Sequence, residues 1–275
     1  MIKINLKQTL SYLMLGLFIS INPATAGTQT NDNLKSIYEM RTITYAILGD
    51  YYMFSGLEGD SRYSRQMHAG VKRFEERLNE ISAASAPSSA LAELTTITRE
   101  WQSYKDLLAT NQSDFLQQGY ANGRLVDDFG KNAVSLEASL EKLYSQVSDN
   151  AERPLSQWTQ YTRDMGLIIR TLTTEYAART TSSLGQVMSI DINEGGMDQQ
   201  VEVFSELLKK LKKAPQDDPQ IYKLMDQVGV KWIFIAKSVA NYNENAVPFI
   251  VNSYGNRISK NLQSIGKHYA KKRAG

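Results

Sequence analysis

The segment VKRFEERLNE, residues 71–80, decides the fold because the chain contains it a second time as VEVFSELLKK, residues 201–210. Val, Phe and Leu recur at the same spacing in both copies. Each copy is followed by a tryptophan: Trp101 lies 27 residues after the Phe of the first copy, and Trp232 lies 28 residues after the Phe of the second. A helix and a tryptophan that recur together indicate two related helical modules.

Two further pairs of segments recur in the same order, at an offset of 125 residues. The expected first helix, residues 34–54, has an apolar face at helical spacing that a later expected helix, residues 155–184, repeats. The matched residues are Met40, Ile43, Ile47 and Tyr51 in the first helix, and Met165, Ile168, Leu172 and Tyr176 in the second. The expected helices at 125–147 and 248–273 match in the same way. We therefore predict an all-α protein of two tandem antiparallel helical modules, each near a four-helix bundle, at residues 30–148 and 152–272.

Turn-forming and capping residues give the expected helix ends. Asp60 and Ser61 are expected to open the second helix, and Asp217 or Asp218 to cap the helix after the APQDDP loop. The third helix is expected at 90–108, residues 27–33 are expected to be flexible, and loops are expected at 82–89, 185–196 and 214–219. The segment VGVKWIFIAKSV, residues 228–239, is apolar nearly all round, which predicts the most buried helix.

The N-terminus has the pattern of a cleaved secretory signal peptide, residues 1–26. Lys3 and Lys7 precede the apolar run 10–21, and the tripeptide Ala-Thr-Ala at 24–26 provides the small residues of a cleavage site. An uncleaved anchor is the alternative, but a membrane span needs about 20 apolar residues. No cysteine follows the run, which excludes a lipoprotein anchor. We predict a soluble periplasmic protein that starts at Gly27.

Charge and composition narrow the function classes. Without Lys3 and Lys7, 29 basic residues balance 29 acidic ones, so nothing favours nucleic-acid binding. The absence of cysteine excludes disulfides, metal–thiolate sites and thiol nucleophiles. The two histidines, His68 and His268, lie in no metal motif, and the chain has no GxSxG, Walker A or GxGxxG sequence. No cofactor or metal is expected, and an enzyme is the least favoured class.

The first module resembles a known family of sensor domains. The residues that carry the resemblance are Met40 and Arg41, the segment YSRQM at 63–67 leading into VKRFEERL at 71–78, WQSY at 101–104 and LEKLY at 140–144. They resemble the helical sensor domain of the type IV pili methyl-accepting chemotaxis transducer N-terminal (PilJ-type) family, which is related to the input domains of nitrate/nitrite sensors. The resemblance covers residues 34–147 and, more faintly, 155–269. It implies a helical ligand-sensing domain with an anion-binding arginine on its first helix.

The chain departs from that family in two respects. The arginine-rich signature of the family's first helix, similar to RQRMLSQR, is reduced here to Arg41, while Arg163 and Arg170 flank Met165 in the second module. No signalling coiled coil or kinase motif follows. The resemblance therefore implies a module that passes information to a separate membrane receptor.

Arg41, Arg163 and Arg170 are the candidate binding residues for a small anion, because each lies on the expected first helix of its module. An arginine fork holds a planar oxyanion with two parallel hydrogen bonds. The alternative is that they pair with nearby carboxylates: Glu39 or Asp50 for Arg41, and Asp164 for Arg163.

The predicted function is a non-enzymatic periplasmic ligand-binding or sensing module that acts through a membrane receptor or a pilus component. The alternative is a structural or adaptor protein of the cell envelope or the pilus machinery. The sequence leaves the ligand and the oligomeric state open.

Overall fold

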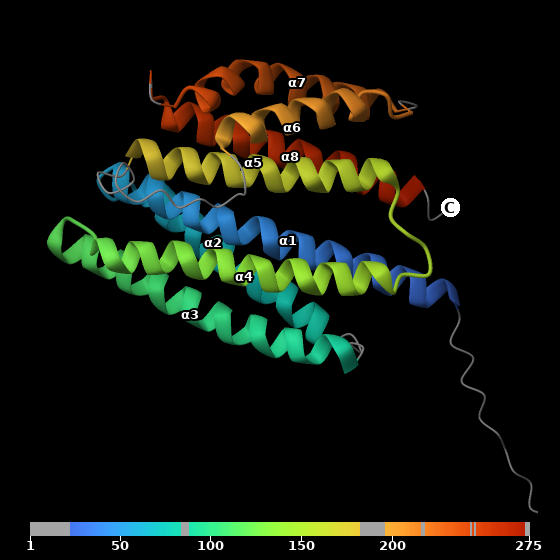
Figure 1. Cartoon of the computed structure of the whole chain (residues 1–275), viewed down its shortest axis with the longest axis horizontal. Coiled ribbons are helices and arrows are strands. Elements are labelled where there is room, and N and C mark those ends of the chain that lie inside the picture. The colour runs from blue at the N-terminus through green and yellow to red at the C-terminus, as the bar shows by residue number, and fades with distance from the viewer. Residues whose placement is uncertain are drawn as a thin grey trace, which may run out of the picture.

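A computed structural model of the chain describes residues 23–83, 88–181, 196–215, 218–242, 244 and 246–272. These residues form helices and connecting turns, without a strand (Figure 1). The first module comprises α1 (Pro23–Gly56), α2 (Ser61–Ala83), α3 (Ser88–Gln118) and α4 (Gly123–Asp149). The second comprises α5 (Gln157–Thr181), α6 (Met197–Leu211), α7 (Pro219–Ala240) and α8 (Pro248–Lys272). The predicted fold class, all-α with two tandem antiparallel helical modules, is confirmed.

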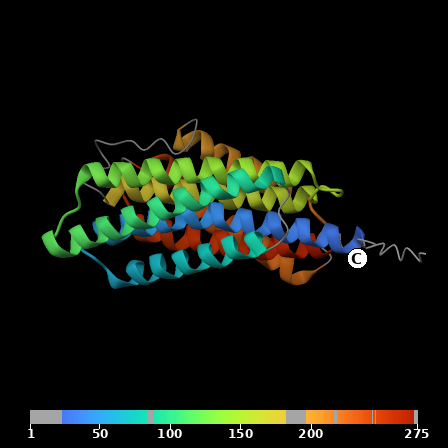
Figure 2. The same ribbon diagram turned by 90° about the horizontal axis from the view of Figure 1, so that it is seen from below.

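Each module packs around its own hydrophobic core. In the first, α1 packs against α2 and α4, and α3 packs against α4; in the second, α5 and α7 each pack against α6 and α8. The modules meet where α1 contacts α5. In Figure 1 the first module is the lower half of the molecule, the second is the upper half, and α1 and α5 lie between. Figure 2 shows that the helices run close to the long axis of the molecule.

The repeated phenylalanine and tryptophan form an aromatic pair in both cores. Phe74 stacks on Trp101 with ring centroids 3.7 Å apart, and Phe204 packs on Trp232 at 4.1 Å. Both tryptophans are 3% exposed. The spacing that predicted a repeated unit therefore places the same contact in both bundles, between the second and third helices of each module.

The predicted helix starts are confirmed at two positions. The Asp60 carboxylate accepts a hydrogen bond from the Arg62 N–H at 2.8 Å before α2. The Asp218 carboxylate accepts one from the Gln220 N–H at 2.8 Å before α7, whereas Asp217 lies outside the described residues. These carboxylates satisfy N–H groups that have no partner inside the helix.

Two helices are longer than predicted. The first begins at Pro23 rather than at residue 34, so the flexible segment expected at 27–33 is helical. The third continues past residue 108 to Gln118, because Phe115 packs on Phe54 with ring centroids 5.2 Å apart and extends the core. Residues 1–22 of the predicted signal peptide, residues 84–87 of the loop predicted at 82–89 and residues 185–195 of the loop predicted at 185–196 lie outside the described residues. The remaining residues of the first loop, 82–83 and 88–89, belong to α2 and α3, so any loop there is shorter than predicted.

The prediction that residues 228–239 form the most buried helix is wrong. One face of α7 is buried and includes Val228 and Trp232, but Val230 is 61% exposed, Ile233 76% and Phe234 61%. The reason is that α7 lies at the outside of the second module and packs chiefly against α6 and α8, which leaves half of its circumference to solvent. Of the helices that the structure describes, none is both long enough and apolar enough to span a bilayer.

Candidate functional site

The two modules meet along a seam, the name used here for the contact of α1 with α5 and the side chains of α4 and α8 that border it. Small residues bring the two helices close together. The Thr174 hydroxyl donates to the Tyr45 carbonyl at 2.7 Å, and the Thr181 hydroxyl donates to the Tyr52 carbonyl at 2.9 Å. A Cβ atom at Gly49 would lie 2.8 Å from the Thr174 Oγ1, so glycine is what permits this approach.

The two helices of the seam run parallel and in register. Three facing pairs are each 125 residues apart, which is the offset of the sequence repeat: Tyr38 with Arg163, Gly49 with Thr174, and Gly56 with Thr181. Equivalent positions of the two modules therefore face one another, as they do across the axis of a symmetric dimer. Facing residues differ in type, so the two walls of the seam carry different chemical groups.

A small cavity of about 50 Å³ opens at one end of the seam, between α1, α5 and α8. Most of its lining surface is apolar, but the lining also includes three cationic side chains and one carboxylate: Lys35, Arg163, Lys267 and Glu39. The Glu39 carboxylate also lies 3.7 Å from the Lys35 ammonium and 3.4 Å from the Arg77 guanidinium. The cations of the wall therefore exceed its acids, which favours a negatively charged occupant.

Arg163 is the most buried cation of this wall, at 8% exposure. Its guanidinium donates to the Tyr144 hydroxyl at 3.0 Å and lies 5.6 Å from the Tyr38 ring centroid. The predicted alternative, a pair with Asp164, is not formed, since the Asp164 carboxylate instead accepts from the Gln160 amide at 2.7 Å. Within the described part of the chain, no carboxylate lies within ion-pair distance of Arg163. A buried cation without a carboxylate is costly unless another anion compensates it.

The Tyr38 side chain completes this end of the seam. A Cβ atom at Gly166 would lie only 1.9 Å from the Tyr38 hydroxyl oxygen, so the missing side chain makes room for the phenol against α5. That hydroxyl is buried and has no hydrogen-bond partner among the described residues. Burial raises the pKa of Tyr38 despite the nearby Arg163 cation, so the phenol stays neutral and can donate a hydrogen bond.

Arg170 lies two turns further along the same face of α5. It donates to the Asn256 side-chain oxygen on α8, while its Nε–H is buried and has no partner in the described structure. The carboxylate that interacts electrostatically with Arg170 is Asp50 on α1. Asp50 is 8% exposed and makes no ion pair with a described residue. Burial raises the pKa of Asp50 to about 7, although Arg170 and Arg73 act in the opposite direction. This carboxyl therefore gains and loses its proton near neutral pH.

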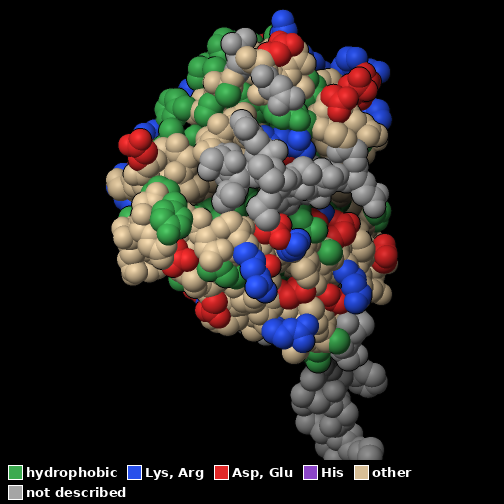
Figure 3. Space-filling model, turned by 60° about the vertical axis from the view of Figure 1, so that its left-hand side comes forward, with side chains coloured by type: hydrophobic (Ala, Val, Ile, Leu, Met, Phe, Trp, Pro, Cys, Tyr) green, Lys and Arg blue, Asp and Glu red, His purple; other side chains and the backbone are tan. Residues whose placement is uncertain are grey.

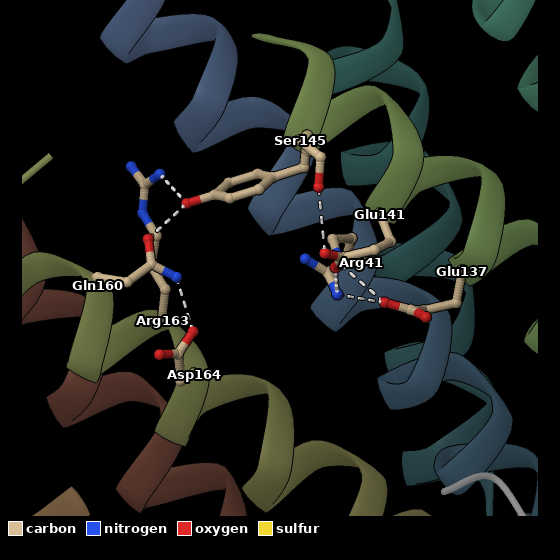
Figure 4. Close-up of polar contacts among 8 residues, drawn as sticks. Arg41, Glu137, Glu141, Ser145, Gln160, Arg163 and Asp164 are labelled. Carbon is tan, nitrogen blue, oxygen red and sulfur yellow. Dashed lines mark hydrogen bonds and ion pairs between the residues drawn. The ribbon is translucent and has the colours of Figure 1, made fainter. Parts of the chain in front are cut away.

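Arg41 is directed away from the seam cavity and toward α4. Figure 4 shows its guanidinium beside Glu137 and Glu141 of α4 and apart from Arg163. The Tyr144 ring centroid lies 5.6 Å from the Arg41 guanidinium and 5.8 Å from that of Arg163. Arg41 bonds the Glu137 carboxylate at 2.7 Å and also forms an ion pair with Glu141. Arg41 thus pairs with carboxylates, as the alternative predicted. The partners are Glu137 and Glu141 on α4, however, and not Glu39 or Asp50.

The structure therefore brings two of the three predicted site residues to the seam. Arg163 and Arg170 share one face of α5, and Arg41 is neutralised inside the first module. Sequence reasoning missed Tyr38 and the α8 side of the cavity. The offset of 125 residues pairs Tyr38 with Arg163, so the sequence repeat contains a signal for this contact.

The histidines take no part in the seam cavity. His68 is exposed and contacts the Ser64 carbonyl oxygen at 2.8 Å, and the His268 Nδ1 lies 3.7 Å from the Asp218 carboxylate. Across the described ranges, no group of three or more His, Cys, Asp or Glu side chains is arranged to hold a metal ion.

Comparisons of the chain with protein-family models, with curated proteins and with solved structures gave no significant match. The resemblance to the PilJ-type family therefore stays a prediction from the residues quoted above.

Proposed function

We propose that this chain is a non-enzymatic, periplasmic ligand-binding module that senses a small anion at the seam and passes the information to a separate membrane receptor. The observation that carries the proposal is Arg163, a buried cation at the wall of a cavity, which has no carboxylate of a described residue within ion-pair distance of its guanidinium. An anion in the cavity would compensate this charge and accept hydrogen bonds from the guanidinium. The Tyr38 side chain also lines the cavity, and its neutral hydroxyl has no hydrogen-bond partner among the described residues.

The size of the cavity limits the ligand class. A volume of about 50 Å³ is a little larger than the ~30 Å³ that one molecule occupies in liquid water. A small inorganic oxyanion or a short carboxylate such as acetate fits this space, whereas a larger metabolite does not. The seam also explains how occupancy becomes a signal. A ligand held by α1, α5 and α8 together favours the arrangement of the two modules that it binds most tightly. The size of this shift is set by the difference in its affinity for the alternative arrangements.

Calorimetric titration with sodium nitrate, sulfate and acetate tests the proposal. Wild-type protein is expected to bind at least one of these anions, and Arg163→Gln to weaken that binding about tenfold or more, as for loss of a charged hydrogen bond. Arg41→Gln is the matched control, because that arginine is already paired with two glutamates. Arg170→Gln reports whether the anion reaches the second cation of α5. Absence of binding in the wild type, or an equal loss in Arg163→Gln and Arg41→Gln, contradicts the proposal.

The periplasmic location is part of the proposal and rests on the signal-peptide pattern of residues 1–26. Material recovered from an exporting host is expected to start at Gly27. N-terminal sequencing checks this, and a start at Met1 contradicts it.

A second candidate function is a structural or adaptor role in the cell envelope or the pilus machinery. The observation that favours it is the row of exposed apolar side chains on α7, which the bundle itself does not need. A thermal-shift screen separates the two functions. A shift with small anions supports sensing, and a shift only with an envelope or pilus protein supports the adaptor.

A further inference from the structure

The exposed face of α7 carries a ridge of large apolar side chains, Val230, Ile233 and Phe234. They are exposed to 61%, 76% and 61% and lie at helical spacing on the face opposite the core contacts of Trp232. Such contiguous exposure of large apolar groups on a soluble surface indicates an interaction site. In the space-filling view, hydrophobic side chains gather on the upper left of the molecule, which belongs to the second module (Figure 3).

The ridge continues onto α8. The Phe234 ring lies 5.2 Å from the Tyr254 ring, centroid to centroid, and Tyr254 is half-buried. Ile250, one turn before Tyr254, is 36% exposed. The apolar surface therefore spans two neighbouring helices, and we call it the α7–α8 ridge.

The rim of the α7–α8 ridge is basic. Lys223 and Lys237 are exposed on the same face of α7, with Asp226 as the one acid of that helix. On α8, the Arg257 guanidinium lies 5.9 Å from the Tyr254 ring centroid. The segment 248–272 contains no Asp or Glu at all. Cations that surround an apolar face favour an anionic partner surface.

The first module shows that the fold does not require this ridge. The alignment of Trp101 with Trp232 sets an offset of 131 residues between α3 and α7. At that offset Arg99, Gln102 and Ser103 occupy the positions of Val230, Ile233 and Phe234. The same face of the equivalent helix is polar in one module and apolar in the other, although both tryptophans are buried alike.

We propose that the α7–α8 ridge docks the protein peripherally on an anionic membrane surface. The apolar side chains enter the boundary between headgroups and acyl chains, and the surrounding Lys and Arg side chains contact the anionic headgroups. The shape supports lipid as the occupant. The most exposed side chain, Ile233, stands on a convex helix surface, and a bilayer accommodates such a ridge without a complementary groove. The α7 part of the ridge lies on the outside of the second module, away from the contact of α1 with α5.

Vesicle flotation with the full mature chain tests the inference. The probes are vesicles of phosphatidylethanolamine with about 30% phosphatidylglycerol, and vesicles of phosphatidylcholine alone. The wild type is expected to float with the anionic vesicles about tenfold more than with the neutral ones, and to lose this preference in about 1 M NaCl, where the Debye length falls to about 3 Å. The variant Ile233→Gln with Phe234→Ser, which installs the residues of the first module, is expected to lose binding about tenfold or more.

Two further variants make the result specific. Leu116→Ser removes an apolar side chain of the first module that is 69% exposed, and it is expected to float like the wild type. Lys237→Glu with Arg257→Glu is expected to abolish the preference for anionic vesicles while the thermal melt stays unchanged. Failure of the wild type to float, or an equal loss in Leu116→Ser, overturns the inference. Sedimentation that shows a dimer dependent on Ile233 and Phe234, without vesicle binding, also overturns it and assigns the ridge to self-association.

Discussion

The two tryptophans occupy equivalent positions in the two modules but differ in their polar contacts. The Trp232 indole N–H donates to the Ser205 hydroxyl at 3.0 Å, whereas the Trp101 indole N–H is buried and has no partner among the described residues. The position equivalent to Ser205 is Glu75, whose carboxylate instead accepts from the Lys105 ammonium at 2.8 Å. The two modules thus share the apolar spacing that a helical bundle needs, but they differ in the polar contacts around the tryptophan.

The outer surfaces differ in the same way. In the first module a wide groove of about 1030 Å³ opens beside α2 and α3, with the charged side chains of Glu75, Arg99 and Lys105 in its lining. In the second module the corresponding helices, α6 and α7, contact each other, and the outward face of α7 is apolar. Packing requirements act on the inner faces alone, so the outer faces of the two modules can differ in chemistry.

The largest expected effect tests whether the two cores are equivalent. Trp101→Ala and Trp232→Ala should each lower the free energy of unfolding by about 3–5 kcal/mol, because each removes a buried ring that packs on a phenylalanine. Urea unfolding followed by circular dichroism measures both. A loss below about 1 kcal/mol in either variant would show that its module does not depend on the aromatic pair.

The buried acids at equivalent positions of α1 and α5 give the next largest difference. Asp50 makes no ion pair with a described residue, whereas its counterpart Glu175 lies 2.6 Å from the Arg179 guanidinium. Because burial raises the pKa of Asp50 from 3.8 to about 7, the folded state holds this proton more tightly than the unfolded state. Stability therefore falls as pH rises from about 4 to about 7, by up to about 4 kcal/mol at about 1.4 kcal/mol per pKa unit.

Asp50→Asn should remove most of this slope, because the side chain no longer ionises. Unfolding free energies measured from pH 4 to pH 8 check it. Burial also raises the pKa of Asp164, so a smaller fall in the same direction should remain in the variant. A wild-type stability that rises across this range would contradict the assignment.

A smaller effect separates the seam from the outer surface. A Cβ atom at Gly56 would lie 2.1 Å from the Thr181 Cβ atom, so Gly56→Ala should force α1 and α5 apart and cost about 1–3 kcal/mol. Gly229 on α7 is the matched control, since its nearest neighbour is the flexible end of Lys212 at 3.3 Å. Gly229→Ala should stabilise the protein by up to about 1 kcal/mol through helix propensity. Thermal unfolding distinguishes these opposite signs.

The smallest expected effect sharpens the comparison of the tryptophans. Trp232→Phe loses the hydrogen bond to Ser205, whereas Trp101→Phe loses no hydrogen bond to a described residue. Trp232→Phe should therefore be more destabilising than Trp101→Phe by about 1 kcal/mol. Equal losses in urea unfolding would indicate that the Trp101 N–H has a partner in solution, such as water.

Apolar periodicity was sufficient to predict the helices and the two related modules, because both follow from patterns along the sequence. The stacking of Phe on Trp in each core became visible only in the structure. The seam was not predictable in the same way. Its close approach depends on Gly49, Gly56 and threonine hydroxyls, which resemble ordinary helix residues in a sequence. Arg41 pairs with Glu137, 96 residues away, so the carboxylates beside it in the sequence were misleading. The burial of residues 228–239 was overestimated because the sequence does not show whether an apolar residue faces the core or the solvent.

The in-register contact of α1 with α5 has a consequence for how a site at the seam responds to dilution. A dimer of two identical chains separates when the protein is scarce, and its two-fold axis places identical residues across from one another. Here both walls belong to one polypeptide, so their effective concentration is fixed by the link between α4 and α5 and not by the amount of protein. The same linkage allows Arg163 to face a tyrosine and Thr174 to face a glycine. Occupancy of the cavity by the proposed anion would then depend on the concentration of that anion and not on the concentration of the protein.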